Sequence, residues 1–223
     1  TTLTGIPSPT GMTREITDYL LAELTRLGFK PQRTPKGTVM CCLGGSGHPL
    51  VLSAHVDALG AMVRSILPNG CLRYTQIGGF NDNAIENETV HIHTREGKVY
   101  TGTVQSVHTS SHVWGDITAE KRDDRSLQIV VDEMTWSKAE TEALGIRPGD
   151  FISLDPRTVV TPSGFIKSRH LDDKASASVL LALAKMAASS DLTLSRKIYL
   201  VFTVHEEVGH GCCAGLPEDV QDI

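Results

Sequence analysis

Three groups of polar residues in this sequence could hold metal ions and activate water. We expect three separate strand ends to supply them: His55 with Asp57, Asp172 with Asp173, and Glu206 with Glu207. Imidazole and carboxylate side chains suit divalent zinc or cobalt. A pair of such cations lowers the pKa of a shared water molecule toward neutrality. We therefore predict that three distant segments meet around two cations.

The residue types suggest separate roles within this cluster. We expect His55 to bind metal, and Asp172 can bridge two cations through its two carboxylate oxygens. Successive side chains at a strand end cannot take the same position, so we assign Glu207 to metal and Glu206 to the base that accepts the proton of water. Asp57 lies two residues after His55, on the same side of the strand, where it can receive the imidazole N–H and fix the tautomer.

Each motif by itself is also compatible with an ordinary structural role. A His-x-Asp sequence can be a surface or core pair, an Asp-Asp pair can cap a helix, and a Glu-Glu pair can be a solvated strand end. Their order, with each motif expected after an apolar strand, makes the combination more specific than its parts. Four further histidines lie in the middle region: His91, His93, His108 and His112. Positions on the surface or on strands explain all four. A second interpretation stays open for His108 and His112, which could reach the site of a neighbouring subunit.

The elements that position the three groups follow from hydrophobic patterning. Residues 8–29 carry a helical stripe, and Gly28 is placed to end that helix. Short apolar runs at 38–43 and 49–56 predict strands, and the run 197–204 predicts a central strand covered on both faces. Residues 176–188 predict a second helix with one apolar face at Val179, Leu183, Met186 and Ala187. Polar groups thus gather at strand ends, where α/β sheets bind ligands.

A region of different character interrupts this α/β pattern. Short alternating segments, including 89–94, 98–107 and 128–132, are separated by glycine and asparagine and predict a β-rich insertion of about 100 residues. We therefore predict an α/β domain formed by 1–64 and 163–223, with residues 65–162 as a separate inserted domain.

Composition excludes several classes of protein. The 223 residues carry a formal net charge of −5 with no basic cluster, which argues against nucleic acid as a partner. No apolar run reaches the roughly 20 residues that cross a bilayer, and the first residues lack a signal-peptide pattern. The five cysteines include two vicinal pairs and no zinc-binding spacing, which favours free thiols in a reducing compartment. We expect a cytoplasmic protein that binds neither nucleic acid nor membranes.

Four ordered motifs resemble the tetrahedral, or deblocking, aminopeptidases, which form family forty-two of the metallopeptidases. The motifs are IPSPTG at 6–11, SAHVDALG at 53–60, LDDK at 171–174 and TVHEEVG at 203–209. Some members of that family carry the labels glutamyl aminopeptidase or endoglucanase. The resemblance extends over essentially the whole chain. It implies a zinc-peptidase-like α/β sandwich with His55 on one metal, Asp172 bridging both, Glu207 on the second and Glu206 as general base.

The inserted region resembles the barrel-like dimerisation domain of the same family. The matching segments are 77–80, 93–97 and 144–150. The resemblance implies dimers that assemble into a hollow homo-dodecamer. It also implies two further ligands, an aspartate on the next strand and a histidine near the end of a longer chain. Asp219 and Asp222 follow Glu207 too closely to replace that aspartate, so we expect a fragment, a proteolysed product or an incompletely described enzyme.

The preferred hypothesis is a two-metal aminopeptidase that releases N-terminal residues from peptides, with zinc or cobalt as cofactor. One alternative keeps the metal pair but acts on N-acylated amino acids, because related two-metal hydrolases share similar strand-end ligands. A second alternative is a non-catalytic assembly module whose β-rich insertion forms subunit contacts.

Overall fold

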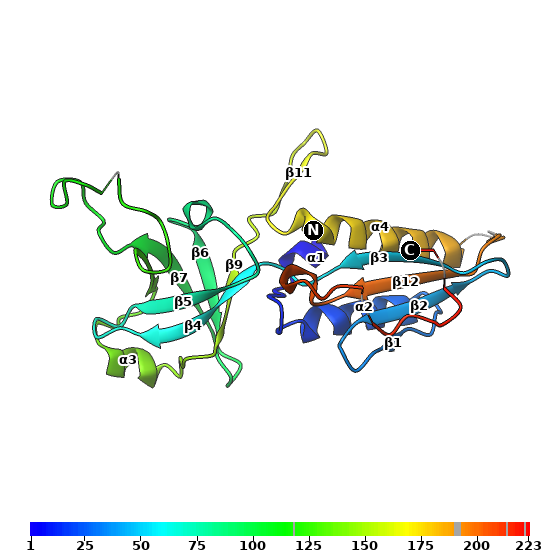
Figure 1. Cartoon of the computed structure of the whole chain (residues 1–223), viewed down its shortest axis with the longest axis horizontal. Coiled ribbons are helices and arrows are strands. Elements are labelled where there is room, and N and C mark those ends of the chain that lie inside the picture. The colour runs from blue at the N-terminus through cyan, green and yellow to red at the C-terminus, as the bar shows by residue number, and fades with distance from the viewer. Residues whose placement is uncertain (118, 190–192, 213, 221) are drawn as a thin grey trace. The chain divides into compact units, whose positions relative to one another are not determined.

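The computed structural model describes residues 1–117, 119–189, 193–212, 214–220 and 222–223. The chain divides into two compact units, one formed by Thr1–Ala58 with Pro156–Ile223 and the other by Leu59–Asp155. An α/β fold interrupted by a β-rich insertion was predicted, and the elements of the two units confirm it (Figure 1). No helix within these described ranges has the length and apolar character needed to span a membrane.

A four-stranded sheet organises the first unit. Its strands are arranged in the order β1 (Gln32–Arg33), β2 (Val39–Gly44), β12 (Ile198–Thr203) and β3 (Leu50–His55). Strand β12 runs parallel to β3 and antiparallel to β2. The central place of β12 agrees with its continuous apolar sequence, since Leu200, Val201 and Phe202 are at most 1% exposed. Its C-terminal end therefore lies beside the C-terminal end of β3.

Two long helices pack on this sheet. Helix α2 (Arg14–Arg26) contacts β1 and β2 and buries Ile16, Leu20 and Leu24, a stripe with the helical spacing of four residues. Gly28 follows in the left-handed region with φ of 93°, as expected for a residue that ends a helix. The short helix α1 (Thr2–Gly5) contacts α4 (Leu171–Ser189), which in turn lies along β3.

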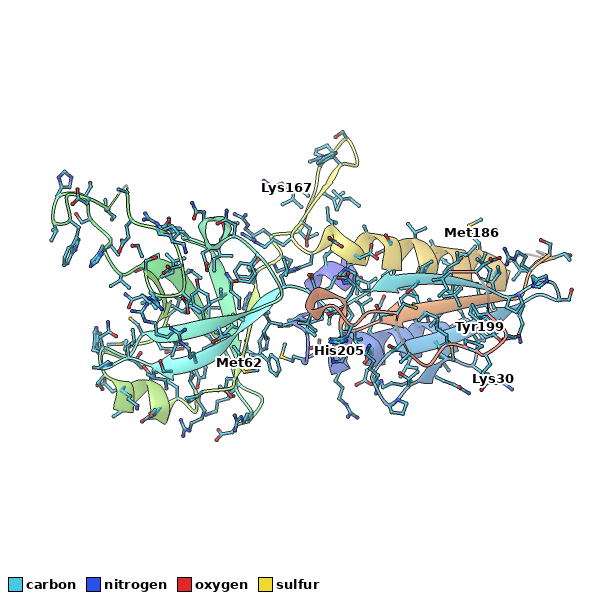
Figure 2. All side chains as sticks on the ribbon, viewed as in Figure 1. Lys30, Met62, Lys167, Met186, Tyr199 and His205 are labelled. Atoms are coloured by element: carbon cyan, nitrogen blue, oxygen red, sulfur yellow. The ribbon has the colours of Figure 1, made fainter. Side chains whose placement is uncertain are left out.

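The buried face of α4 differs in part from the expected one, because Leu183 packs partly buried against the core as predicted but two other members of the predicted face do not. Ala177, Leu180 and Ala184 face the core, whereas Val179 is 66% exposed and Met186 is 58% exposed. Figure 2 shows Met186 on the outer side of this helix. Because apolar residues occur nearly all round the helix, its periodicity does not single out one face. The small alanines allow the helix backbone to approach the sheet closely.

The second unit is a closed six-stranded barrel. The strand order around it is β4 (Gly60–Ile66), β5 (Leu72–Ile77), β8 (Leu127–Val131), β7 (Val99–Ser106), β6 (Thr89–His93) and β9 (Phe151–Leu154). Alternate side chains of these strands fill the interior, among them Val63, Leu72, Ile92, Val104 and Ile152. Helix α3 (Lys138–Ala143) and the short 3-10 helix η1 (Asp82–Ala84) lie in its connections.

The unit boundaries lie a few residues before the predicted ones. Strand β4 begins at Gly60 and pairs with β5 and β9, so it belongs to the barrel and not to the α/β domain. The hairpin of β10 (Val159–Val160) and β11 (Ile166–Lys167) belongs to the first unit. Sequence character changes gradually at both junctions, whereas strand pairing sets a sharp limit.

Candidate metal centre

Two parallel strands deliver the histidine and the glutamate pair to one edge of the sheet. His55 is the last residue of β3 and is paired in register with Thr203, the last residue of β12. After His205, which Figure 2 labels beyond the end of β12, the 3-10 helix η2 (Glu206–Val208) begins. Because parallel strands end at the same edge, this register places Glu206 beside His55.

The two aspartates lie in the first turn of α4 and not, as predicted, at the end of a strand, since the preceding strand β11 ends at Lys167. Their backbone departs from helical geometry, with ψ of 108° at Asp172, and the peptide bond between Asp172 and Asp173 is cis. The carboxylate of Asp173 accepts a hydrogen bond from the backbone N–H of His55 at 3.3 Å. The side chain of Asp172 is 93% exposed, and its Oδ1 lies 3.0 Å from His55 Nε2. Hydrogen bonds therefore link the start of α4 to the last residue of β3.

The His55 imidazole contacts acceptors on both of its nitrogens. Nδ1 lies 3.0 Å from the backbone carbonyl oxygen of Asp57, and Nε2 lies 3.0 Å from Asp172 and 3.6 Å from Glu206 Oε2. Burial lowers the pKa of His55, but the bonds to Asp57 and Asp172 outweigh burial and raise the pKa to about 9. An Nδ1–H that donates to the Asp57 carbonyl leaves Nε2 as the nitrogen that can bind an ion.

Asp57 is fully buried, and its side-chain carboxylate accepts hydrogen bonds mainly from backbone N–H groups. Oδ2 accepts from the Thr10 hydroxyl at 2.7 Å and from the Glu207 N–H at 3.3 Å, and Oδ1 accepts from the Glu206 N–H at 3.2 Å. Burial raises the pKa of Asp57, but these bonds and the one to His55 hold the pKa below its ordinary value. The predicted contact to His55 exists, mostly through the carbonyl, since the carboxylate oxygen lies 3.5 Å from Nδ1.

The two glutamates lie in different surroundings. The side chain of Glu206 is 54% exposed, and Glu207 is less exposed. Burial raises the pKa of Glu207, the charge of His55 opposes this, and the carboxylates of Asp57, Asp172 and Glu206 raise it further. A bound cation would reduce the repulsion between Glu207 and these three carboxylates.

Lys174 and Thr10 belong to this neighbourhood although no role was predicted for them. Lys174 is 1% exposed and donates from Nζ to the carbonyl of Ile6 at 2.8 Å. Burial lowers its pKa to about 8, and the charge of Asp57 opposes that shift. A lysine next to an acidic pair reads as a solvated charge in the sequence. The threonine carries no signal of its own beyond its place in the first motif.

The donor types match divalent zinc or cobalt, which bind imidazole nitrogen and carboxylate oxygen. His55 Nε2 lies near the carboxylates of Asp172 and Glu206 at one edge of the sheet, and the negative charges of these carboxylates and of Asp57, which raise the pKa of Glu207, provide the electrostatic attraction for a cation. Within the described part of the chain, however, no three His, Cys, Asp or Glu side chains are grouped so that they could hold an ion. The chemistry of the residues thus fits a metal centre, and their present contacts are hydrogen bonds to one another.

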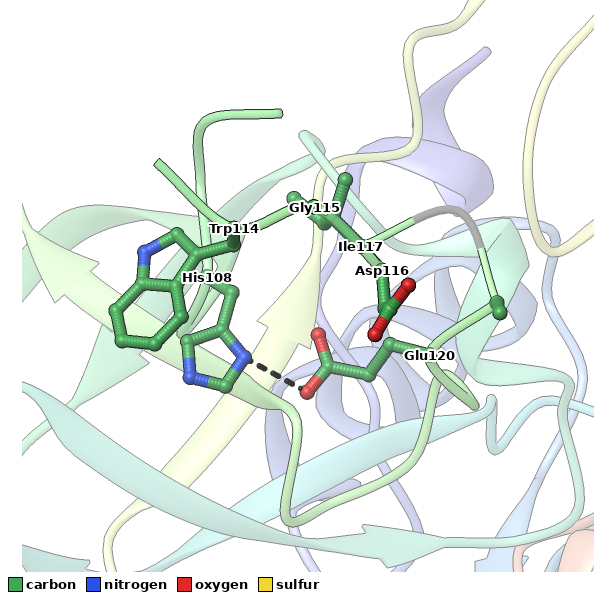
Figure 3. Close-up of a pocket in the computed structure, with 7 residues that line it drawn as sticks. His108, Trp114, Gly115, Asp116, Ile117 and Glu120 are labelled. Carbon is green, nitrogen blue, oxygen red and sulfur yellow. Dashed lines mark hydrogen bonds and ion pairs between the residues drawn. The ribbon is translucent and has the colours of Figure 1, made fainter. Parts of the chain in front are cut away.

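The histidines of the barrel make separate contacts. His91 Nε2 lies 3.2 Å from Asp155, and His93 Nε2 lies 2.8 Å from the Ser153 hydroxyl. His108 Nδ1 lies 2.9 Å from Glu120 Oε1, with its ring 4.1 Å from the ring of Trp114 (Figure 3). A pocket of about 400 Å³ surrounds this pair and is lined by His108, Trp114, Gly115, Asp116, Ile117, Ala119 and Glu120.

Comparison with known proteins identifies the family. A family described as M42 glutamyl aminopeptidase matches residues 37–222. "Putative aminopeptidase YhfE" of Bacillus subtilis (strain 168) is 42% identical over 219 residues, which cover 97% of this chain and 63% of that protein. The chain thus spans less than two thirds of the length of this relative.

Two solved structures share the fold. Aminopeptidase APDkam598 from the archaeon Desulfurococcus kamchatkensis is 29% identical, with a TM-score of 0.80 over 93% of this chain and 55% of its own. The TET1 peptidase of Pyrococcus horikoshii, described as assembling into a tetrahedron or a large octahedral shell, is 25% identical, with a TM-score of 0.79 over 93% of this chain and 60% of its own. On the family match and the identity to the Bacillus subtilis relative, the chain belongs to the M42 glutamyl aminopeptidase family.

Proposed function

We propose that the protein carrying this sequence is a two-metal aminopeptidase that releases N-terminal residues from peptides. Membership of an aminopeptidase family supports the reaction class. The observation that carries the proposal is the convergence of three segments, with His55 Nε2 3.0 Å from Asp172 and 3.6 Å from Glu206. Imidazole and carboxylates at the edge of the sheet where two parallel strands end form the type of site that metal-assisted hydrolysis requires.

Each residue has a defined task in this proposal. His55, Asp172 and Glu207 hold two zinc or cobalt ions, which when bound supply the positive charge that activates water and polarises the scissile carbonyl. Glu206 takes the proton of the attacking water and passes it to the leaving amine. Its exposure and its distance from His55 suit a base that must reach substrate. Asp57 holds the backbone of both glutamates and, through its carbonyl, the tautomer of His55.

A substrate panel tests the reaction class. Peptides with a free α-amine are compared with the same peptides acetylated at that amine, and with N-acylated amino acids. The proposal expects release of N-terminal residues from the free peptides alone. Hydrolysis of the acylated compounds with free peptides left intact would instead establish the deacylase alternative, and no hydrolysis of either by metal-loaded protein would favour the assembly module.

Variants of the glutamates separate the two proposed roles. Glu206→Gln should lower kcat by about 100- to 10,000-fold while metal content stays unchanged, because it removes the base alone. Glu207→Gln should lower metal affinity. The reverse pattern, with metal lost in Glu206→Gln and retained in Glu207→Gln, would exchange the assignments.

We further propose that the protein forms homo-oligomers through the barrel unit, with a dodecamer as the assembly. The tetrahedron or large octahedral shell described for the TET1 peptidase of Pyrococcus horikoshii supports oligomer formation, and the dodecamer described for PhTET1-12s supports the number of subunits. Light scattering coupled to size-exclusion chromatography measures the mass directly, and a monomer at micromolar concentration would refute the oligomer.

We also propose a cytoplasmic location, which is supported by the free thiols of Cys41, Cys42, Cys71 and Cys212.

A further inference from the structure

A short segment near the start of the chain runs alongside the end of β3. The Ser8 hydroxyl donates to the Val56 carbonyl at 2.7 Å, and the Ala58 N–H donates to the Ser8 carbonyl at 2.8 Å. The Thr10 N–H donates to the Ala58 carbonyl at 3.3 Å. These bonds hold the segment on both sides of Asp57, so Thr10 has a fixed position relative to that carboxylate.

The Asp57 carboxylate is shared between this segment and the turn that carries the glutamates. Its Oδ2 accepts both the Thr10 hydroxyl at 2.7 Å and the Glu207 N–H at 3.3 Å. Its Oδ1 accepts the Glu206 N–H at 3.2 Å. Thr10 is 7% exposed and Asp57 is fully buried, so water has little access to replace a missing donor. The Thr10 bond is the shortest of the three.

Lys174 anchors the same segment at its other end. Its ammonium group is buried and donates to the Ile6 carbonyl at 2.8 Å. Its positive charge also acts on Asp57. The segment from Ile6 to Thr10 is therefore held by a buried cation at one end and by a buried carboxylate at the other.

We infer that Thr10 is a positioning residue of the metal centre, because its hydroxyl fixes the Asp57 carboxylate, which in turn holds the backbone of Glu206 and Glu207. This inference rests on the proposed function where it concerns chemistry, since the effect passes through the two glutamates. Loss of the hydroxyl frees one carboxylate oxygen to rotate away from the Glu207 N–H. Both glutamate side chains then lose part of their orientation.

Amide hydrogen exchange measured by NMR tests the positioning role without metal or substrate. In Thr10→Val, which preserves shape but lacks the hydroxyl, the amides of Glu206 and Glu207 should exchange roughly tenfold faster. Thr10→Ser restores the donor and should return both rates to within about twofold of wild type. Ser8→Ala is the matched control, because it removes a buried hydroxyl from the same segment without touching Asp57.

Cobalt titration then tests the consequence for the metal centre. Thr10→Val should weaken cobalt binding by about 10- to 100-fold, with Thr10→Ser close to wild type. Should Thr10→Val not fold, Thr10→Ala is judged by the same exchange rates. Unchanged exchange at both glutamates, or equal acceleration in Ser8→Ala, would overturn the inference. A wild-type protein that binds no cobalt would refute the proposed function, while the exchange rates still decide the role of Thr10.

Discussion

Replacing Asp57 by asparagine is expected to destabilise the first unit, because asparagine keeps the shape of the side chain but supplies only one acceptor oxygen. The aspartate carboxylate accepts from Thr10 and from the backbone N–H groups of Glu206 and Glu207. If the new amide nitrogen takes the position of Oδ2, it faces the Glu207 N–H. If it takes the position of Oδ1, it faces the Glu206 N–H. In either orientation one partly buried backbone donor meets another donor.

The magnitude follows from these contacts. An N–H that points at the buried side chain of residue 57 and loses its acceptor costs about 1–3 kcal/mol. The remaining bonds lose the strength that the negative charge gives them, about 1 kcal/mol more. We therefore expect Asp57→Asn to lower the free energy of unfolding by about 2–4 kcal/mol. Asp18→Asn, on the exposed side of α2, is the control and should have little effect, because its partner Arg33 forms a solvent-exposed ion pair.

Urea denaturation followed by far-ultraviolet circular dichroism measures this change. The helical signal comes mainly from α2 and α4, and both belong to the unit that contains Asp57. A stability for Asp57→Asn within about 0.5 kcal/mol of wild type would show that the carboxylate does not hold the glutamate turn. The reasoning about the buried network would then be wrong.

Three further predictions concern the cores of the two units. Gly102→Ala should destabilise the barrel by about 1–3 kcal/mol, because the new Cβ would lie 2.8 Å from Ile129 and 2.9 Å from the Val130 carbonyl oxygen. Urea unfolding followed by tryptophan fluorescence measures this change, and a midpoint equal to that of wild type would contradict the prediction. Burial lowers the pKa of His93 from its ordinary value of 6.5 to about 4, so the unfolded barrel takes up a proton at a higher pH than the folded barrel does. The free energy of unfolding should therefore fall by roughly 2–3 kcal/mol as the pH drops from about 6.5 to about 4. Urea midpoints at both ends of the window check this, and an equal loss in His93→Gln would assign the effect to other groups. Lys174→Ala should cost about 2–4 kcal/mol through the cavity and the lost bond to the Ile6 carbonyl, measured by the dichroism assay above, and an unchanged midpoint would refute it.

The sheet could be predicted because its strands are short, continuous apolar runs, and the first long helix because its apolar residues follow one clear helical period. Ile16, Leu20 and Leu24 are buried as the helical stripe indicates, and the apolar run of β12 lies at the centre of the sheet. The face of α4 could not be predicted, because apolar residues surround the helix and only its approach to β3 decides which are buried.

In the site, too, the residue types could be predicted from the sequence, whereas some of the three-dimensional contacts could not. Residues at strand ends are recognisable by type, and His55, Asp172 and Glu206 do lie together. The contacts of Thr10 and Lys174 depend on a segment about 50 residues or more away along the chain, which no local pattern encodes. The metal-binding and base roles of the individual residues stay predictions.

Metal content and activity measured on the same preparation test the central claim that His55, Asp172 and Glu207 share a pair of cations. The account predicts two zinc or cobalt ions per chain in the protein that carries this sequence, loss of peptide hydrolysis with a chelator, and recovery on adding cobalt. We also expect Asp172→Asn to lose both ions together, because the role proposed for this carboxylate is to bridge them. Hydrolysis that persists in the metal-free protein, or an Asp172→Asn variant that keeps both ions, would contradict it.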